Sequence, residues 1–342
     1  MKHIYKSLLL ALIVLLTAQT AVKSQTYSLP GDGKDFFVGF VNPSYNKVAH
    51  PATVAFYGAY ALVSSYTDNH ITISYFDKQS GVEMPGQRFF IPERTGIQIP
   101  LNTFLMTPND TGDVPEFCSA HIIADRPINV EFFSSGACGG GSYLPITTAG
   151  LGRKYVIASY QDNPGELGIQ CYYYQPSKIE VSEGFFEIIA TVDGTSVTIT
   201  PNSTTMGGHT GFSSGQYANN TEIPYTVSLR RGQCYFVKSA SSDNTDDISN
   251  SIVVSNKPIA VIAGHENAAL GGVSNRLLEG RDYMVEQMYP YEMWDTTGFV
   301  MIPLKDSQPA DASTYDGVGE MYRIFTTERP GTQVNFFDGC IG

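Results

Sequence analysis

The strongest constraint on the fold is a phrase that the chain repeats. Residues 188–201 read IIATVDGTSVTITP, which is an apolar stretch, an Asp-Gly turn, a second β-branched stretch and a proline. Blurred copies occur at 62–76 (LVSSYTDNHITISYF) and at 324–337 (IFTTERPGTQVNFF). Two alternating apolar runs joined by such a turn are typical of a β-hairpin. The chain is therefore predicted to consist of a repeated β unit.

The phrases around the hairpin repeat as well. The most similar pair closes a unit: HIIADRPINVEFFSSG at 121–136 matches SIVVSNKPIAVIAGHE at 251–266, and their corner prolines, Pro127 and Pro258, are 131 residues apart. Further matches are the opening strands at 35–42, 153–161 and 296–304, and the pairs of strands at 88–101 and 224–239, in which Thr95-Gly96 and Arg231-Gly232 are expected to turn one strand back on the next.

A period near 130 residues suits two four-stranded propeller blades or one sandwich domain. The fold is predicted to be all-β, built from repeated antiparallel meander units; we favour a propeller-like array, with tandem β-sandwiches as the alternative. Composition agrees, because 21 Tyr, 19 Phe, 33 Gly and 19 Pro suit short strands and tight turns. The predicted divisions are a signal peptide (1–24), a first unit (25–150), a second unit (151–293) and a truncated third unit (294–342).

The first 24 residues have the three parts of an export signal. Lys2 and Lys6 precede an apolar run at 8–16, and the small residues Val22 and Ser24 precede Gln25. The nine residues of this run are far fewer than the roughly 20 needed to span a bilayer, so a cleaved signal is predicted rather than a membrane anchor, and no later segment offers a span. The protein is expected to be extracellular, either secreted or displayed on the cell surface.

The charge balance excludes some partners. The whole chain carries 21 Lys and Arg against 33 Asp and Glu; the signal contains three of the lysines, so the mature balance is 18 minus 33, or −15. An acidic chain repels phosphate backbones and anionic lipid heads. Neither nucleic acid nor a membrane surface is an expected partner.

Cysteine usage fits an oxidising compartment. The five cysteines are Cys118, Cys138, Cys171, Cys234 and Cys340. We expect disulfides between Cys118 and Cys138 and between Cys171 and Cys234, although spacing alone does not fix connectivity. No two cysteines have C-x-x-C spacing, so no metal site is expected among them.

Several phrases resemble the N-terminal domain of the IgGFc-binding protein family. They occur in the family's order and span nearly the whole mature chain: GKDFFVGF (33–40), ATVDGTSVTITP (190–201), YTVSLRRGQCY (225–235), IVVSNKPIAVIAGHE (252–266) and RDYMVEQMYPYEMW (281–294). The resemblance implies an extracellular binding or adhesion module without enzymatic activity. It does not imply antibody binding, because no ligand-contact motif carries over, and GHENAALGG lacks the cysteine that the family usually places after this strand.

Candidate catalytic groups are few. His265 beside Glu266 and Asp282 could act as a general base or metal ligand, although a surface histidine bonded to a loop is the favoured interpretation. Glu187, Asp193 and Asp282 are candidates for the facing carboxylates of a glycosidase. No nucleophile signature or zinc spacing occurs, so no catalytic, cofactor or metal residue is assigned.

Two kinds of segment could bind a ligand. The acidic loop 241–249, with Asp243, Asp246 and Asp247, is a weak candidate for calcium against a plainly solvated turn. Aromatic clusters at 171–176 (CYYYQP) and 288–294 (MYPYEMW) are either contact patches or core strands.

The sequence therefore predicts a secreted or surface adhesion module that binds a protein or glycan through loops. The alternatives are a glycan-active hydrolase on a propeller scaffold and a structural spacer of the extracellular matrix.

Overall fold

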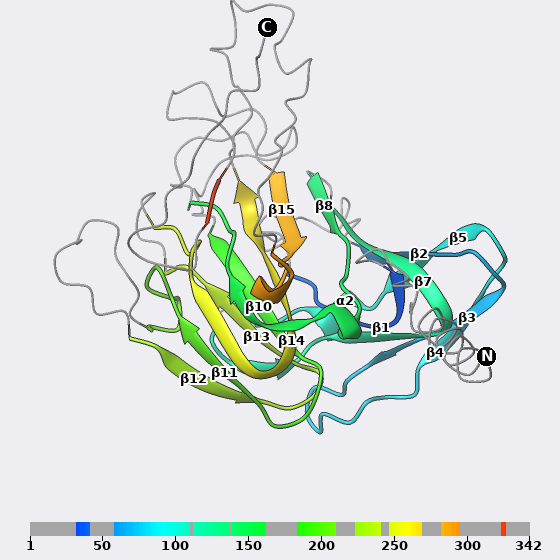
Figure 1. The fold of residues 1–342 in the computed structure, drawn as a ribbon, viewed down its shortest axis with the longest axis horizontal. Helices are drawn as coiled ribbons and strands as arrows, with labels where there is room; N and C mark the ends of the chain where they lie inside the picture. Colours follow the sequence, from blue (N-terminus) through cyan, green and yellow to red (C-terminus); the bar gives the residue numbers. More distant parts are fainter. Residues whose placement is uncertain are drawn as a thin grey trace, which may run out of the picture.

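The computed structural model describes residues 32–41, 58–109, 112–136, 139–161, 183–209, 223–240, 246–268, 282–294 and 323–325. Most of the described residues lie in strands, which pair antiparallel, and the helices are short; this confirms the all-β class (Figure 1). They make one seven-stranded and one eight-stranded sheet. The third repeat, apart from Trp294 and residues 323–325, lies outside the described residues.

The first sheet contains the strands of the first repeat. It is made of β1 (Asp32–Val38), β2 (Gly58–Ser65), β3 (Asn69–Tyr75), β4 (Gln87–Ile91), β5 (Thr95–Leu101), β7 (Ala120–Gly136) and β8 (Gly139–Tyr143). A short helix, α2 (Thr103–Met106), follows β5 and begins at Asn102, whose side chain accepts a hydrogen bond from the backbone of Leu105.

The second sheet contains the strands of the second repeat and one strand from the first. It is made of β9 (Gly152–Val156), β10 (Gly184–Ala190), β11 (Thr195–Thr200), β12 (Tyr225–Leu229), β13 (Gln233–Lys238), β14 (Ile252–Ala268), β15 (Asp282–Gln287) and the added β6 (Pro115–Phe117). The 3-10 helix η2 (Thr148–Gly150) lies between β8 and β9, and η3 (Tyr291–Met293) follows β15.

The two sheets share one topology, which confirms the internal repeat. Strand order is β4-β3-β7-β2-β5 in the first and β12-β11-β14-β10-β13 in the second, with β1 and β8 on β7 matching β9 and β15 on β14. The longest strands, β7 and β14, are each 17 residues long and are the shared neighbour of four others. Figure 1 shows β14 as a strongly curved ribbon.

The predicted hairpins at 62–76 and 188–201 are wrong, and the strand order is not a simple meander; the hairpin predicted at 324–337 lies outside the described residues apart from 324–325. β2 and β3 both pair with β7, β3 along residues 120–124 and β2 along 129–135. The two arms of the Asp193-Gly194 turn, β10 and β11, likewise both pair with β14. The turns at 92–94 and 230–232 also join strands that pair with other partners rather than with each other in the described sheets. Each expected hairpin among the described residues is therefore a corner at which one long ribbon bends.

Proline explains where the corners lie. Pro127 in β7 and Pro258 in β14 carry no N–H for the ladder. The register shifts at these points, between Ile123 and Ile128 against β1 and between Val254 and Ile259 against β9. A hydrogen bond holds the corner between β10 and β11 against Pro258: Thr191 Oγ1 donates to the carbonyl of Pro258 at 3.0 Å. Because the described strands form large bent sheets rather than four-stranded blades, a propeller is not confirmed.

The second sheet is covered on both faces. Every residue of β10 is buried. Ile189 belongs to a core shared with the first sheet, together with Ala260 and Ile262, whereas Ile188 and Val261 belong to a second core on the opposite face. A continuous apolar strand is what burial on two sides requires.

The turn between β12 and β13 enters the first unit at Gly232. This glycine has φ of 82°, and a Cβ there would lie 2.6 Å from the ring of Phe76. We therefore expect Gly232→Ala to lose about 1–2 kcal/mol of stability from the left-handed backbone and a further 1–3 kcal/mol from overpacking, measured by urea unfolding.

Gly208→Ala is the matched control. Gly208 has φ of 89° with no atom within 4 Å of the added Cβ, so this variant should show the backbone effect alone. Equal losses in the two variants would contradict the proposed packing of Gly232 against Phe76.

Candidate functional site

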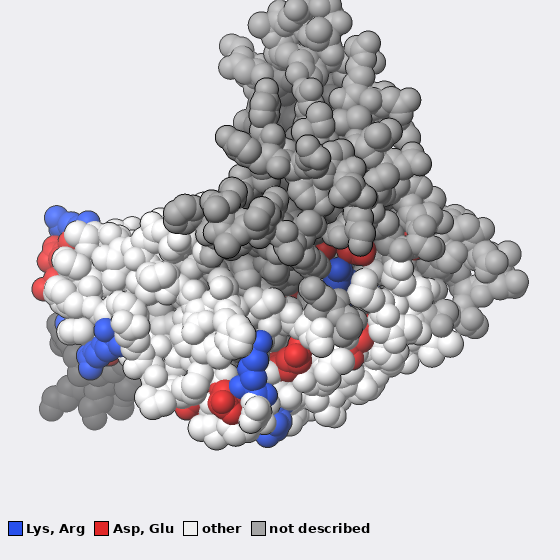
Figure 2. All heavy atoms as spheres, turned by 180° about the vertical axis from the view of Figure 1, so that it is seen from behind, with Lys and Arg blue, Asp and Glu red and all other residues white. Residues whose placement is uncertain are grey.

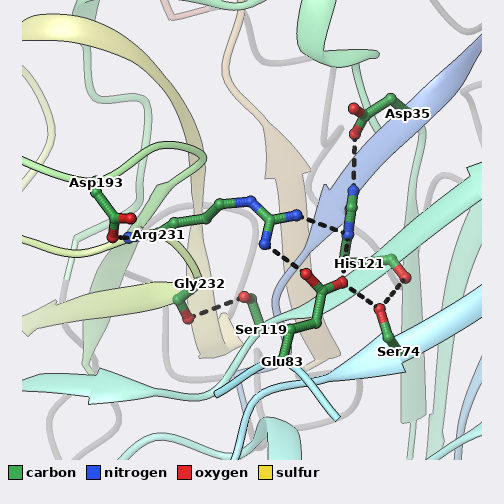
Figure 3. A network of polar contacts seen from close by, with 8 residues as sticks. All are labelled: Asp35, Ser74, Glu83, Ser119, His121, Asp193, Arg231 and Gly232. Carbon is green, nitrogen blue, oxygen red and sulfur yellow. Dashed lines mark hydrogen bonds and ion pairs between the residues drawn. The ribbon is translucent and has the colours of Figure 1, made fainter. Parts of the chain in front are cut away.

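Three places in the structure bring functional side chains together. The first, the polar junction, consists of Asp35, Ser74, Glu83, His121 and Arg231 (Figure 3). Its members come from β1, β3, the loop before β4, β7 and the β12–β13 turn. Only Arg231 belongs to the second unit, so this side chain spans the boundary between the two units.

Arg231 is held by charge and by aromatic rings. One guanidinium nitrogen donates to Glu83 Oε2, and the other lies 3.0 Å from His121 Nδ1. The guanidinium carbon also lies 5.3 Å from the ring centre of Phe37 and 5.5 Å from that of Phe76. Stacking of Arg on aromatic faces adds an attraction to that of the ion pair.

The backbone of the turn is fixed from both units. Arg231 N–H donates to Asp193 Oδ1 at 2.9 Å within the second unit. From the first unit, Ser119 Oγ donates to the carbonyl of Gly232 at 3.0 Å. These contacts set the direction in which the Arg231 side chain leaves the turn.

His121 occupies the centre of the junction. Its side chain is only 3% exposed, its Nδ1 lies 2.7 Å from Glu83 Oε1, and its Nε2 lies 3.0 Å from Asp35 Oδ1. The ring stacks on Phe37 with centroids 4.4 Å apart. Because both ring nitrogens already have carboxylate partners, the arrangement suits an inter-unit clamp better than proton transfer to a ligand.

Glu83 is the electrostatic partner of this clamp. Burial by itself would raise the pKa of its carboxyl, but hydrogen bonds from Ser74, Arg231 and His121, together with the charge on His121, outweigh that effect and lower the pKa to about 2. The Ser74 bond is 2.5 Å long.

The second place is an exposed aromatic patch, defined by Tyr289, Tyr291, Met293 and Trp294. Tyr289, Tyr291 and Met293 are 48%, 42% and 43% exposed. Trp294 meets Tyr291 edge to face at 5.4 Å, and its Nε1–H donates to the carbonyl of Tyr289 at 3.3 Å. Within the phrase at 288–294, Met288 and Pro290 are buried, whereas Tyr289, Tyr291, Glu292 and Met293 are exposed.

Two residues of strand β9 contact the segment that carries this patch. Lys154 Nζ lies 4.6 Å from the ring centre of Tyr291. Glu292 Oε1 accepts a hydrogen bond from the backbone N–H of Arg153 at 3.0 Å. The patch therefore presents fixed rings with a cation beside them. The other aromatic phrase, at 171–176, lies outside the described residues.

The third place is a buried thiol-carboxylate cluster of Cys118, Glu187 and Cys234. One ligand-type atom from each lies within 4.8 Å of the others. Burial raises the pKa of both thiols, and it raises the pKa of Glu187 to about 8. This is the one group of His, Cys, Asp and Glu in the described part of the chain that could hold a metal ion. Glu187, the nearer of the other two members, lies 69 residues from Cys118 along the chain, so no local sequence motif revealed the cluster.

The predicted disulfides are not present. Cys118 and Cys234 are both free and buried, whereas their expected partners, Cys138 and Cys171, lie outside the described residues, as does Cys340. The sequence pairing assumed that each unit closes its own bridges. The pairing of β6 with β13 instead brings Cys118 of the first unit beside Cys234 of the second.

The expected surface position of His265 is also wrong. His265 and Glu266 are buried in β14, because this strand is covered on both faces. Glu266 pairs with Lys238 at 3.1 Å, and Lys238 also pairs with Glu183 at 2.9 Å. The side chain of Asp282 is not among those described.

Two of the carboxylates proposed for a hydrolase, Glu187 and Asp193, lie in different environments. Glu187 is fully buried in the core, whereas Asp193 lies in the exposed corner between β10 and β11. Of the candidate calcium ligands, Asp246 accepts from Ser203 at 3.1 Å and Asp247 pairs with Arg323 at 2.5 Å. Asp243 lies outside the described residues.

Comparison with known families supports the resemblance of the phrases between residues 190 and 294. A family model described as IgGFc binding protein matches residues 141–339, which is more than half of the chain. The chain belongs to the IgGFc-binding family. The family match covers the aromatic patch, Glu187, Cys234 and Arg231, but not the first sheet before β8. No curated protein and no solved structure matches the chain significantly.

Glu83 makes the polar junction sensitive to acid. Its folded pKa of about 2 lies below the ordinary 4.5, so its contribution to stability is complete above about pH 4.5 and is lost as the pH falls toward 2. We expect Glu83→Gln to be about 1–3 kcal/mol less stable near neutral pH, and to lose less stability on acidification than the parent. Urea unfolding across this range measures both effects.

Glu93→Gln provides the control, because Glu93 is exposed in the corner between β4 and β5. It should follow the parent at every pH. An unchanged acid dependence in Glu83→Gln would show that the junction does not contribute in this way.

Proposed function

We propose that this chain is an extracellular adhesion module that binds a protein or glycan surface through the aromatic patch. Membership of the IgGFc-binding family supports a binding role, and the export signal predicted at residues 1–24 supports an extracellular location. None of the described helices is long and apolar enough to cross a membrane.

The single observation that carries the proposal is the solvent exposure of the side chains of Tyr289, Tyr291 and Met293. Three large side chains are nearly half exposed within one short segment, although their neighbour Met288 is buried. Leaving such groups in contact with water is unfavourable, and Tyr and Trp are enriched at the centres of binding interfaces. Because the rings are fixed by Trp294 and Glu292, a ligand would lose little entropy in ordering them.

The surface charge supports contact with neutral or mixed ligands. On the face drawn in Figure 2, the described Lys, Arg, Asp and Glu side chains lie in small mixed groups, and most of the described surface is uncharged. Lys154 beside Tyr291 adds a local positive charge. The face drawn in Figure 2 shows no large positive region among the described residues, so a protein or glycan with few acidic groups suits it better than a polyanion.

The test is binding of the full chain to glycan and protein arrays, followed by affinity measurement for any retained ligand. The double variant Tyr291→Ala/Met293→Ala removes two exposed members of the patch. We expect its affinity to fall at least tenfold, since truncating a hot spot costs about 2 kcal/mol or more.

Tyr66→Ala is the control, because Tyr66 is a tyrosine that is 80% exposed at the corner between β2 and β3. Its affinity should match that of the parent. If the parent retains no ligand, the adhesion role fails; if the double variant binds as well as the parent, the role stands and the patch is not the site.

A further inference from the structure

The thiol-carboxylate cluster lies across three neighbouring strands of the second sheet. β6 pairs with β13 through Glu116 and Cys234, and Cys118 directly follows β6. β13 pairs with β10 through Cys234 and Ile189, two residues along from Glu187. Cys118 and Glu187 are therefore both diagonal neighbours of Cys234. Because side chains alternate along a strand, all three point to the same face of the sheet, toward the shared core.

The distances suit a common ligand between the three side chains. Cys118 Sγ lies 3.8 Å from Glu187 Oε1, and the three ligand-type atoms are within 4.8 Å of one another. With Zn–S of about 2.3 Å and Zn–O of about 2.0–2.2 Å, neighbouring donors of a tetrahedral zinc lie about 3.5–3.8 Å apart. Small movements of the side chains would bring all three to these separations.

One atom of the cluster has no partner. Glu187 is fully buried, and its Oε2 makes no hydrogen bond. A Cβ on Gly39 would lie 2.1 Å from this oxygen, so the backbone of Gly39 closes directly over it. An unpaired buried carboxyl oxygen is costly unless something not yet bound satisfies it.

We propose that Cys118, Cys234 and Glu187 bind a structural zinc ion. Two sulfurs and the carboxylate of Glu187 supply the donors, and bidentate binding through both oxygens would complete a distorted four-donor site and give Oε2 its missing partner. Thiolates select zinc over calcium or magnesium, which prefer oxygen ligands alone. The ion would join β6 of the first unit to β10 and β13 of the second.

A disulfide between Cys118 and Cys234 explains the structure less well. Diagonal positions on paired strands are about 7–8 Å apart at Cα, whereas disulfides need about 4.4–6.8 Å. A disulfide would also leave Glu187 Oε2 buried and unpaired. The disulfide is nevertheless a measurable alternative outcome.

The experiment is metal analysis of the full chain, purified without chelator and then loaded with zinc or with cobalt as a spectroscopic probe. We expect about one zinc per chain by mass spectrometry and, with cobalt, a sulfur-to-metal charge-transfer band. Glu187→Gln should weaken zinc binding at least about tenfold, and Cys118→Ser/Cys234→Ser should abolish the band. A chelator should lower the Tm of the parent but leave that of Cys118→Ser/Cys234→Ser unchanged.

Glu116→Gln is the matched control. Glu116 lies beside the cluster, opposite Cys234, but its carboxylate accepts from the backbone of Asn109 at 2.5 Å. This variant should bind zinc like the parent. Peptide mapping that finds a Cys118–Cys234 disulfide, absence of the band in the folded parent, or unchanged affinity in Glu187→Gln would each overturn the proposal. These outcomes are independent of the array result, because the aromatic patch contains none of these residues.

Discussion

Pairing along one long strand in each unit is the constraint on which the rest of the structure depends. β7 and β14 each carry partners on both edges, and each contains a proline at the level where its partners turn. Since the ladders with β1 and β9 shift register there, the ribbons of a unit bend at the same level. The bends fold the second sheet around one core while its other face covers the core of the first.

Much of this fold could be predicted from sequence. The repeated phrases identified both units, and the matching corners at Pro127 and Pro258 marked the bends. The pairing was misread because an Asp-Gly turn has the same local chemistry whether its arms pair with each other or with a third strand. Only the distant strands β7 and β14 decide between these outcomes, and local patterns do not contain that information.

A site formed by one short segment of the sequence was easier to predict than a site assembled from distant segments. The aromatic patch lies within seven residues and was recognised as a possible contact surface. The polar junction draws on positions 35, 83, 121 and 231, and the cysteine cluster on 118, 187 and 234, so both exist only once the units are assembled. Burial of His265 was missed for a related reason: its strand is covered from both sides, which the sequence of one unit does not reveal.

Strand β6 has a consequence for how such proteins can change. It belongs to the first unit in the chain but completes the edge of the second sheet at β13. A gene encoding the second unit alone would produce a sheet with an unpaired edge at β13, and unpaired edge strands tend to pair with strands of other molecules. Duplication or exchange of this module during evolution should therefore keep the two units together as one inheritable block.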